Sequence, residues 1–124
     1  MNKNKKTILI VDDEPEMVEE LKEILEDEGY NIDTAFDGVE AVEKFKSIHQ
    51  ETGLVLLDIK MPKMNGVEVY RKMKRINQNT PIIIVTGSFA KKNAEQLLKE
   101  GANDVIFKPF DVRKLLALIR KEVC

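Results

Sequence analysis

At 124 residues the chain is long enough for one domain with a substantial core and too short for two ordinary domains. Its 20 Lys and Arg nearly balance 22 Asp and Glu, which argues against a nucleic-acid-binding surface and favours protein partners. The single cysteine, Cys124, excludes an internal disulfide and suits a reducing cytosol. No segment resembles a signal sequence or a membrane-spanning helix, so we expect a cytoplasmic protein without membrane contacts.

Five short apolar runs rich in Ile and Val alternate with five stretches of helical periodicity. This alternation is typical of an α/β fold, in which crossover helices cover both faces of a parallel sheet. The first, third and fourth runs are the most continuously apolar, so we expect these strands at the centre of the sheet and regard the other two as more marginal. In chain order, the predicted strands are Thr7–Val11, Asn31–Ala35, Leu54–Leu57, Pro81–Thr86 and Asp104–Phe107.

A stripe of apolar residues at helical spacing follows each predicted strand. Acid-then-base pairs four residues apart, such as Glu40 and Lys44, indicate solvated outer faces on these helices. Gly29 and Gly101 follow the first and fourth helices, where a left-handed residue commonly ends a helix. The stripes are Met17, Val18, Leu21, Ile24 and Leu25; Val39, Val42 and Phe45; Val67, Tyr70 and Met73; Ala94, Leu97 and Leu98; and Val112, Leu115, Leu116 and Ile119.

Three carboxylates lie where predicted strands end, with Asp12 and Asp13 after the first strand and Asp58 after the third. In an open parallel sheet, ligands bind beyond the carboxyl ends of the strands, so these side chains converge if the two strands are neighbours. Capping of a helix that begins at Pro15 explains one acidic residue but not two adjacent aspartates. Carboxylate oxygens are typical Mg²⁺ ligands, so the pattern predicts a divalent metal site. We do not expect Glu14 to be a direct ligand, because it points on into the helix start.

Asp58 is the predicted nucleophile. A lone aspartate after a strand is most often a turn former, but the neighbouring acids favour a carboxylate that accepts a phosphoryl group as an acyl phosphate. Thr86 and Lys108 end the fourth and fifth strands, and although strand propensity or an edge charge explains either one alone, together they offer a hydroxyl and an ammonium for phosphoryl oxygens. Gly87 leaves room beside the carboxylate, and a cis bond before Pro109 would aim the lysine inward.

Taken in chain order, these motifs resemble the receiver domain of two-component response regulators. The resemblance covers essentially the whole chain, so residues 1–124 are expected to form one receiver domain. It implies a flavodoxin-like, doubly wound (βα)5 fold with sheet order 2-1-3-4-5, an order that the residues alone do not supply. The motifs are Asp12-Asp13, Asp58 within Leu56-Leu57-Asp58-Ile59-Lys60-Met61-Pro62-Lys63-Met64-Asn65-Gly66, Thr86, and Lys108-Pro109-Phe110.

The resemblance implies a phosphoacceptor rather than an enzyme. A histidine kinase or a histidine phosphotransfer protein would transfer a phosphoryl group to Asp58. Mg²⁺, or Mn²⁺, would be held by Asp13, Asp58 and the backbone carbonyl of Lys60, with Asp12 acting through water. The phosphorylated chain, as a monomer or a weak phosphorylation-linked dimer, would then bind a downstream protein target or pass the phosphoryl group on in a phosphorelay.

The resemblance also implies a switch at the phosphorylated site. Thr86 and Lys108 would bind the phosphoryl oxygens, and their movement would signal to the surface formed by the fourth helix, fifth strand and fifth helix. Receivers often carry a switching aromatic residue three positions before this lysine. This chain has Val105 there and Phe107 directly before the lysine, which argues against the usual aromatic rotamer switch.

Several alternatives compete with an active receiver. Haloacid-dehalogenase-like phosphatases also phosphorylate an aspartate with Mg²⁺, but their nucleophile follows the first strand in an Asp-x-Asp motif, whereas Asp12 and Asp13 are adjacent. A flavin site needs small residues in the first loop to cradle a phosphate, and the acidic residues there would repel it. A receiver-like fold that only docks partners, and a receiver excised from a longer regulator with a DNA-binding or enzymatic output domain, remain open.

Three further polar residues have ordinary explanations. Lys60, two positions past the nucleophile, is typical of a loop charge, although its ammonium could alter the lifetime of the acyl phosphate. Ser88, two positions past Thr86, allows the same hypothesis. His49 lies in a loop-like stretch, is expected to be exposed and is a poor phosphodonor. The lysine after Asp58 and the full-length match favour a relay, in a chain with no appended output module.

Overall fold

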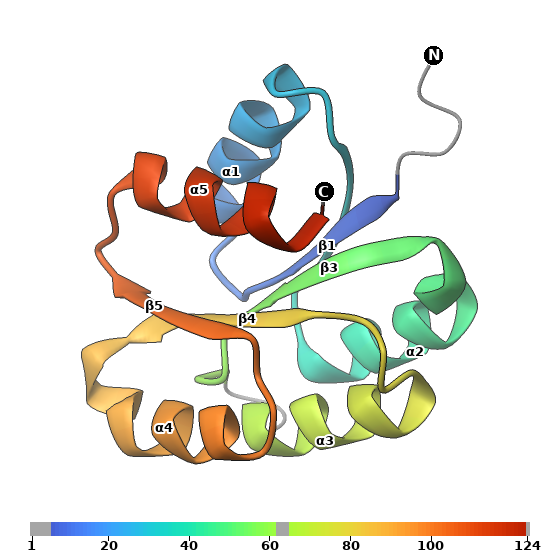
Figure 1. Ribbon diagram of the computed structural model, residues 1–124, viewed down its shortest axis with the longest axis vertical. Coiled ribbons are helices and arrows are strands. Elements are labelled where there is room, and N and C mark those ends of the chain that lie inside the picture. Colours follow the sequence, from blue (N-terminus) through green and yellow to red (C-terminus); the bar gives the residue numbers. More distant parts are fainter. Residues whose placement is uncertain (1–5, 62–64, 124) are drawn as a thin grey trace.

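The computed structural model describes residues 6–61 and 65–123, in which five parallel strands form one sheet with helices on both faces (Figure 1). The strand order is β2-β1-β3-β4-β5, as the resemblance implied. Register is continuous from β1 to its neighbour β2, whereas the pairing of β1 with β3 shifts between Thr7 and Ile8. The strands are β1 (Thr7–Val11), β2 (Asn31–Ala35), β3 (Thr52–Leu57), β4 (Ile82–Gly87) and β5 (Asp104–Lys108).

The predicted central position of β1, β3 and β4 is confirmed. Nearly every residue of these strands is buried, whereas β2 and β5 lie at the two edges and are mostly half-buried. A strand covered on both faces requires a continuous apolar run, and an edge strand does not. The main difference in bounds is at β3, which begins two residues earlier than predicted because Thr52 pairs with Thr7.

In the described residues, four α-helices connect the strands and a fifth, α5, follows β5. Figure 1 shows α1 and α5 together on one face of the sheet, and α2, α3 and α4 on the other. Two short 3₁₀ turns, η1 (His49–Glu51) and η2 (Ser88–Ala90), precede β3 and α4. The helices are α1 (Pro15–Asp27), α2 (Gly38–Ile48), α3 (Gly66–Ile76), α4 (Lys91–Lys99) and α5 (Val112–Val123).

The core is divided into two apolar layers by the sheet. Alternate residues of a strand point to opposite faces, so Ile8 and Ile10 pack with α1 and α5 while Leu9 and Val11 pack with the other three helices. Both layers are fully buried along the three central strands. This double coverage fixes the register of β1 and β3, and therefore where their carboxyl ends lie.

Both predicted helix-ending glycines are confirmed. Gly29 follows α1 with φ of 96°, and Gly101 follows α4 with φ of 117°. These left-handed values favour glycine because it has no Cβ to collide with the backbone. None of the helices in the described parts of the chain is long and apolar enough to cross a membrane.

An exposed ion pair joins α3 to the end of α4. The Arg71 guanidinium donates from Nε and from its second terminal nitrogen to the two Glu100 oxygens, at 2.9 and 2.6 Å, and Gln96 donates to the same carboxylate. Hydrogen bonds from Arg71, and then from Gln96, lower the pKa of Glu100 to about 2 from 4.5. A carboxyl with a depressed pKa stabilises the fold only while it is ionised.

We therefore expect the Arg71–Glu100 pair to contribute its full stabilisation above pH 4.5 and to lose it as the pH falls to about 2. The wild type should exceed Arg71→Met in free energy of unfolding at pH 7, and the two should converge near pH 2. Urea unfolding at pH 7, 4 and 2.5 measures this difference. A gap of equal size at every pH would contradict the assignment.

Candidate functional site

The two strand-end aspartates that were predicted to converge lie side by side at the carboxyl edge of the sheet. β1 and β3 are neighbours, and Val11 pairs with Leu57, so Asp12 and Asp58 leave the sheet together. The Asp58 backbone N–H donates to the Val11 carbonyl at 2.9 Å, which fixes the next residue beside its neighbour strand. Both aspartates are buried, with exposed fractions of 1% and 5%.

Asp58 is held by three donors. Its Oδ1 accepts hydrogen bonds from the Thr86 hydroxyl at 2.8 Å and from the Lys60 backbone N–H at 2.9 Å. Its Oδ2 accepts one from the Lys108 ammonium at 3.1 Å. Thr86, the next-to-last residue of β4, is fully buried, so solvent does not compete for its hydroxyl. The carboxylate therefore has a fixed orientation, with a neutral hydroxyl on one oxygen and a cation on the other.

Lys108 is the cation of the cluster. From the last position of β5, its Nζ reaches Asp12 Oδ2 at 2.7 Å, Glu14 Oε1 at 3.0 Å and Asp58 Oδ2 at 3.1 Å. Burial of the ammonium lowers its pKa, but hydrogen bonds to Asp12 and Glu14 and the nearby carboxylate charges outweigh burial, so the pKa lies above its ordinary value. The bond between this lysine and Pro109 is cis, as predicted.

Asp12 lies in an environment that disfavours its charge. Burial raises the pKa of this carboxyl to about 6, and the Asp58 charge adds to the rise, against the opposing hydrogen bond from Lys108. At this carboxyl, burial and the Asp58 charge thus outweigh the opposing effect of Lys108 on the pKa. Because a single ammonium faces three carboxylates, the site favours a further cation.

The acidic group fits a divalent metal. Asp12, Asp13 and Asp58 each offer a carboxylate oxygen, and these oxygens all lie within 4.8 Å of one another. The Lys60 peptide adjoins them through its hydrogen bond to Asp58. Asp13 is more open to solvent than the other two aspartates, so a hydrated ion can reach it. An all-oxygen donor set on one open edge suits Mg²⁺, which keeps several of its waters.

Sequence analysis missed one member of the cluster. Glu14 was expected to point into the start of α1, and no contact with Lys108 was foreseen, yet its carboxylate lies 3.0 Å from that ammonium. It occupies the N-cap position of α1 without a side-chain cap hydrogen bond. The Asp12 carboxylate instead accepts the Glu14 backbone N–H at 3.0 Å. The lysine is 94 residues away in sequence, so no local pattern could have revealed the pair.

A cavity of about 530 Å³ opens onto Asp58. Phe89 stands at its rim with 74% of its surface exposed, a feature that the sequence did not predict. The presence of Asp58 in the lining means that a donor can reach the predicted nucleophile. The lining residues are Asp13, Glu14, Asp58, Lys60, Gly87, Ser88, Phe89, Lys108 and Pro109.

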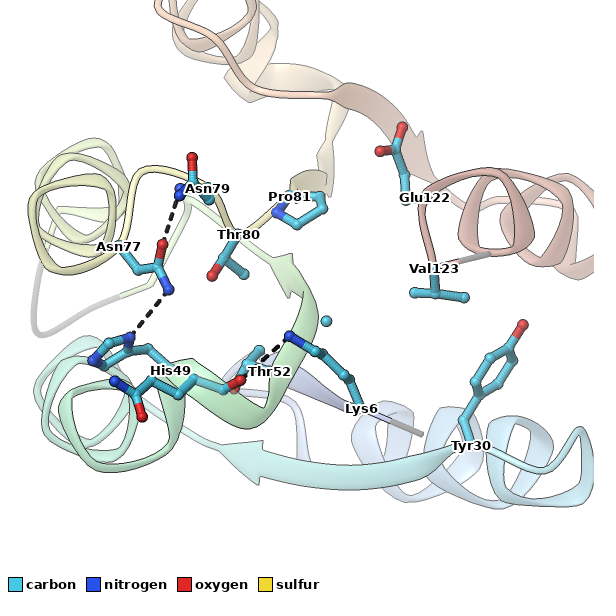
Figure 2. A pocket seen from close by; sticks show the side chains of 12 residues that line it. Lys6, Tyr30, His49, Thr52, Asn77, Asn79, Thr80, Pro81, Glu122 and Val123 are labelled. Carbon is cyan, nitrogen blue, oxygen red and sulfur yellow. Dashed lines mark hydrogen bonds between the residues drawn. The ribbon is translucent and has the colours of Figure 1, made fainter. Parts of the chain in front are cut away.

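A second cavity, of about 480 Å³, lies away from this cluster and is lined by Lys6, the start of β3, the loop before β4 and the end of α5 (Figure 2). There the Asn77 side-chain amide donates to His49 Nδ1 at 3.1 Å. His49 is half-buried in η1 rather than exposed in a loop, and its ring lies 5.9 Å from that of Phe45. Among the residues lining this cavity, Glu122 is the one carboxylate, so it lacks the grouped acids of the first site.

The comparisons with known proteins agree with this geometry. The family model described as "Response regulator receiver domain" matches residues 8–120. The chemotaxis protein CheY of Treponema pallidum is 36% identical over 113 residues, which cover 90% of this chain and 78% of that protein. The chain spans about half the length of the transcriptional regulators that it also matches.

Two solved structures are similar over nearly the whole chain. The response regulator TrrA of Thermotoga maritima, crystallised in complex with Mg(2+)-BeF, has a TM-score of 0.82 and 38% identity, covering 94% of this chain and 97% of that one. The CheX-CheY-BeF3-Mg+2 complex of Borrelia burgdorferi has a TM-score of 0.87 and 36% identity, covering 94% of this chain and 87% of the matched one. Their sheet and this one therefore superimpose closely.

Proposed function

This chain belongs to the family of response regulator receiver domains, and from that membership we propose that it is a phosphoacceptor signalling switch in which Asp58 receives the phosphoryl group. The observation that carries the proposal is the convergence of Thr86 Oγ1 and Lys108 Nζ on the two oxygens of Asp58, at 2.8 and 3.1 Å. A turn-forming aspartate has no need of a buried hydroxyl and a shared ammonium. A phosphoacceptor needs both.

The donor would be a phosphohistidine on a histidine kinase or a histidine phosphotransfer protein. An Asp58 oxygen attacks the phosphorus, a P–O bond forms as the P–N bond breaks, and the bonding electron pair returns to the imidazole nitrogen. Thr86 and Lys108 would exchange their contacts with the carboxylate for contacts with phosphoryl oxygens. Both side chains already contact the Asp58 carboxylate, so only short movements would be required.

Asp12, Asp13, Asp58 and the Lys60 backbone carbonyl would hold Mg²⁺, or Mn²⁺, in the acidic group. When bound, the ion would supply positive charge opposite the phosphoryl oxygens. The fit of three grouped aspartates supports this assignment, as does the Mg(2+)-BeF complex of the similar Thermotoga maritima protein. Lys108 would be freed from the carboxylates in the same event, because a second cation would take over part of their charge.

Phosphorylation would alter binding of a downstream protein target or feed a phosphorelay, and the chain itself would not turn over a substrate. The complex of a similar CheY with CheX supports a protein partner. The proposal takes residues 1–124 as one receiver domain, cytoplasmic, without nucleic-acid contacts, and monomeric or weakly dimeric on phosphorylation. The half-length match to transcriptional regulators supports an alternative, in which this receiver is part of a longer regulator with an output domain. The genomic reading frame decides between the two.

The phosphoacceptor assignment is tested with acetyl phosphate and Mg²⁺. We expect intact-mass spectrometry to detect a gain of one phosphoryl group on the wild type and none on Asp58→Asn. Asp33→Asn, which removes a β2 carboxylate paired with Lys44 of α2, should be phosphorylated like the wild type. Absence of any gain, even with an authentic kinase, would contradict the proposal and favour a protein that only docks partners.

A further prediction concerns Lys60, which lines the same cavity as Asp58. Its ammonium lies 5.7 Å from the Phe89 ring centroid in the wall of the cavity, where it can attract the anionic phosphoryl group and restrict water. The acyl phosphate of Lys60→Ala should therefore be hydrolysed faster than that of the wild type, by about fivefold if the lost interaction is worth about 1 kcal/mol. Dephosphorylation of purified phosphoprotein measures this rate. Lys46→Ala, an exposed lysine on α2, is the matched control, and equal rates for all three proteins would remove the idea.

A further inference from the structure

The most exposed large apolar side chain among the described residues lies beside the phosphoacceptor. Phe89 is 74% exposed, compared with 53% for Val39 and 43% for Leu98. A single exposed apolar residue needs no explanation on most surfaces. This one lines the same cavity as Asp58, in the η2 turn that directly follows the strand carrying Thr86.

The ring of Phe89 is braced from two sides. A Cβ built on Gly87 would lie 2.9 Å from Phe89 Cδ1 and closer still to Cε1, so the ring packs directly on the glycine backbone. From the loop after β3, the Lys60 ammonium lies 5.7 Å from the ring centroid, within cation–π range. A braced aromatic ring loses little conformational freedom when a partner covers it, and such rings dominate the binding energy of many interfaces.

The rim of the cavity is divided by charge. Beyond Glu14, the exposed face of α1 is acidic, with Glu16, Glu19, Glu20 and Glu23 lining one groove. On the other side, the exposed Lys60 lies beside the Phe89 ring, and the exposed Lys91 and Lys92 follow Ala90 at the start of α4. Figure 1 shows α1 and α4 on opposite faces of the sheet, so the carboxyl edge separates the two charges. A protein bound over Asp58 would therefore contact acidic side chains of α1 on one side and lysines near Phe89 on the other.

We propose that Phe89, with Lys60 beside it and Lys91 and Lys92 at the start of α4, anchors the phosphohistidine-bearing donor protein during transfer to Asp58. The inference rests on the proposed function and names the donor surface that fits, an apolar hollow rimmed by acidic side chains. Geometry selects this occupant, because a phosphohistidine that transfers its phosphoryl group to Asp58 must enter the cavity that Phe89 lines, which brings the protein carrying it over the exposed ring. A small phosphodonor can enter the same cavity, but it has no protein surface that could pack against Phe89.

The test compares two donors on the same variants. The small donor is phosphoramidate, and the protein donor is the autophosphorylated histidine kinase that loads the wild type fastest among those encoded in the same genome. We expect Phe89→Ala to lower the ratio of kinase to phosphoramidate transfer, each as kcat/KM, by about 10-fold or more, through KM. Phe89→Tyr keeps the ring and should keep the ratio. Leu98→Ala, an exposed apolar residue further along α4, should not change it.

Charge reversal gives an independent arm. Lys91→Glu combined with Lys92→Glu should slow association with the kinase several-fold, and the loss should shrink as salt rises. An unchanged ratio for Phe89→Ala overturns the inference, and so does a wild type that phosphoramidate loads but no kinase does. A wild type that phosphoramidate does not load at Asp58 overturns the proposed function instead, and the inference with it. Circular dichroism melting of Phe89→Ala confirms that the exposed substitution leaves the fold intact.

Discussion

Lys108→Met is expected to slow phosphorylation of Asp58 by acetyl phosphate by about 10²–10³-fold, the usual loss when a donor to developing negative charge is removed. Lys108 is the one cation that contacts both Asp12 and Asp58 in the part of the chain that the structure describes. Methionine has a similar length and no charge, so the variant removes the ammonium while filling much of its space. Time courses followed by intact-mass spectrometry give the rate.

The same substitution should also lower the free energy of unfolding. Removing one partner of a buried ion pair costs about 3–5 kcal/mol, and we expect a smaller loss of about 2 kcal/mol because Lys108 is partly exposed. Lys44→Met is the matched control, since it removes a lysine paired with Asp33 at 3.0 Å far from the site. The control should lose little stability and no phosphorylation rate. A Lys108 variant that reacts as fast as the wild type would exclude this lysine from the chemistry.

The second large effect is expected from Gly66→Ala. Gly66 is the first residue of α3, and its N–H donates to the Ile59 carbonyl at 3.2 Å. A Cβ at this position would overlap the Ile59 backbone, which cannot move aside as a flexible side chain can. The loop after Asp58 must therefore shift. We expect a loss of about 1–3 kcal/mol in free energy of unfolding, as for other overpacked sites, measured by urea denaturation.

Because Lys60 lies in that loop next to Ile59, the Gly66 variant should also bind Mg²⁺ more weakly, by about tenfold or more if one ligand is misplaced. Asn65→Ala is the control. It removes the N-cap hydrogen bond from the Val67 N–H to Asn65 Oδ1 at 2.8 Å, at a cost of about 1 kcal/mol, without crowding Ile59. Titration of Mg²⁺ against both variants separates a loosened helix from a displaced loop. Equal affinities in the wild type and Gly66→Ala would contradict the packing argument.

The fold was predictable where burial leaves a strong pattern. The apolar runs of β1, β3 and β4 identified them as central strands because only residues covered on both faces need to be apolar throughout. The inclusion of Thr52 in β3 was not predicted, because its pairing with Thr7 depends on the backbone and leaves no side-chain pattern in the sequence. The order of the strands could not come from periodicity, which reports on faces and not on neighbours. It required the family resemblance.

The candidate site was predictable to the extent that strand ends share one edge. Asp12, Asp58, Thr86 and Lys108 each follow or end an apolar run, so topology alone brings them together. Glu14 and Phe89 were missed for different reasons. Glu14 contacts a lysine distant in sequence, and Phe89 is placed at the cavity beside Asp58 by a short 3₁₀ turn. Such properties arise only after the chain has folded.

The buried hydroxyl of Thr86 has one hydrogen, which it donates to Asp58 Oδ1. A hydroxyl that donates a full hydrogen bond to a phosphoryl oxygen would have to give up its hydrogen bond to Asp58, so the two arrangements of this side chain compete. It is fully buried next to the last residue of β4, so bulk solvent does not compete for this hydrogen bond. Occupancy of the neighbouring carboxylate would thus be converted into a single torsional choice, read at the start of the segment that leads to α4.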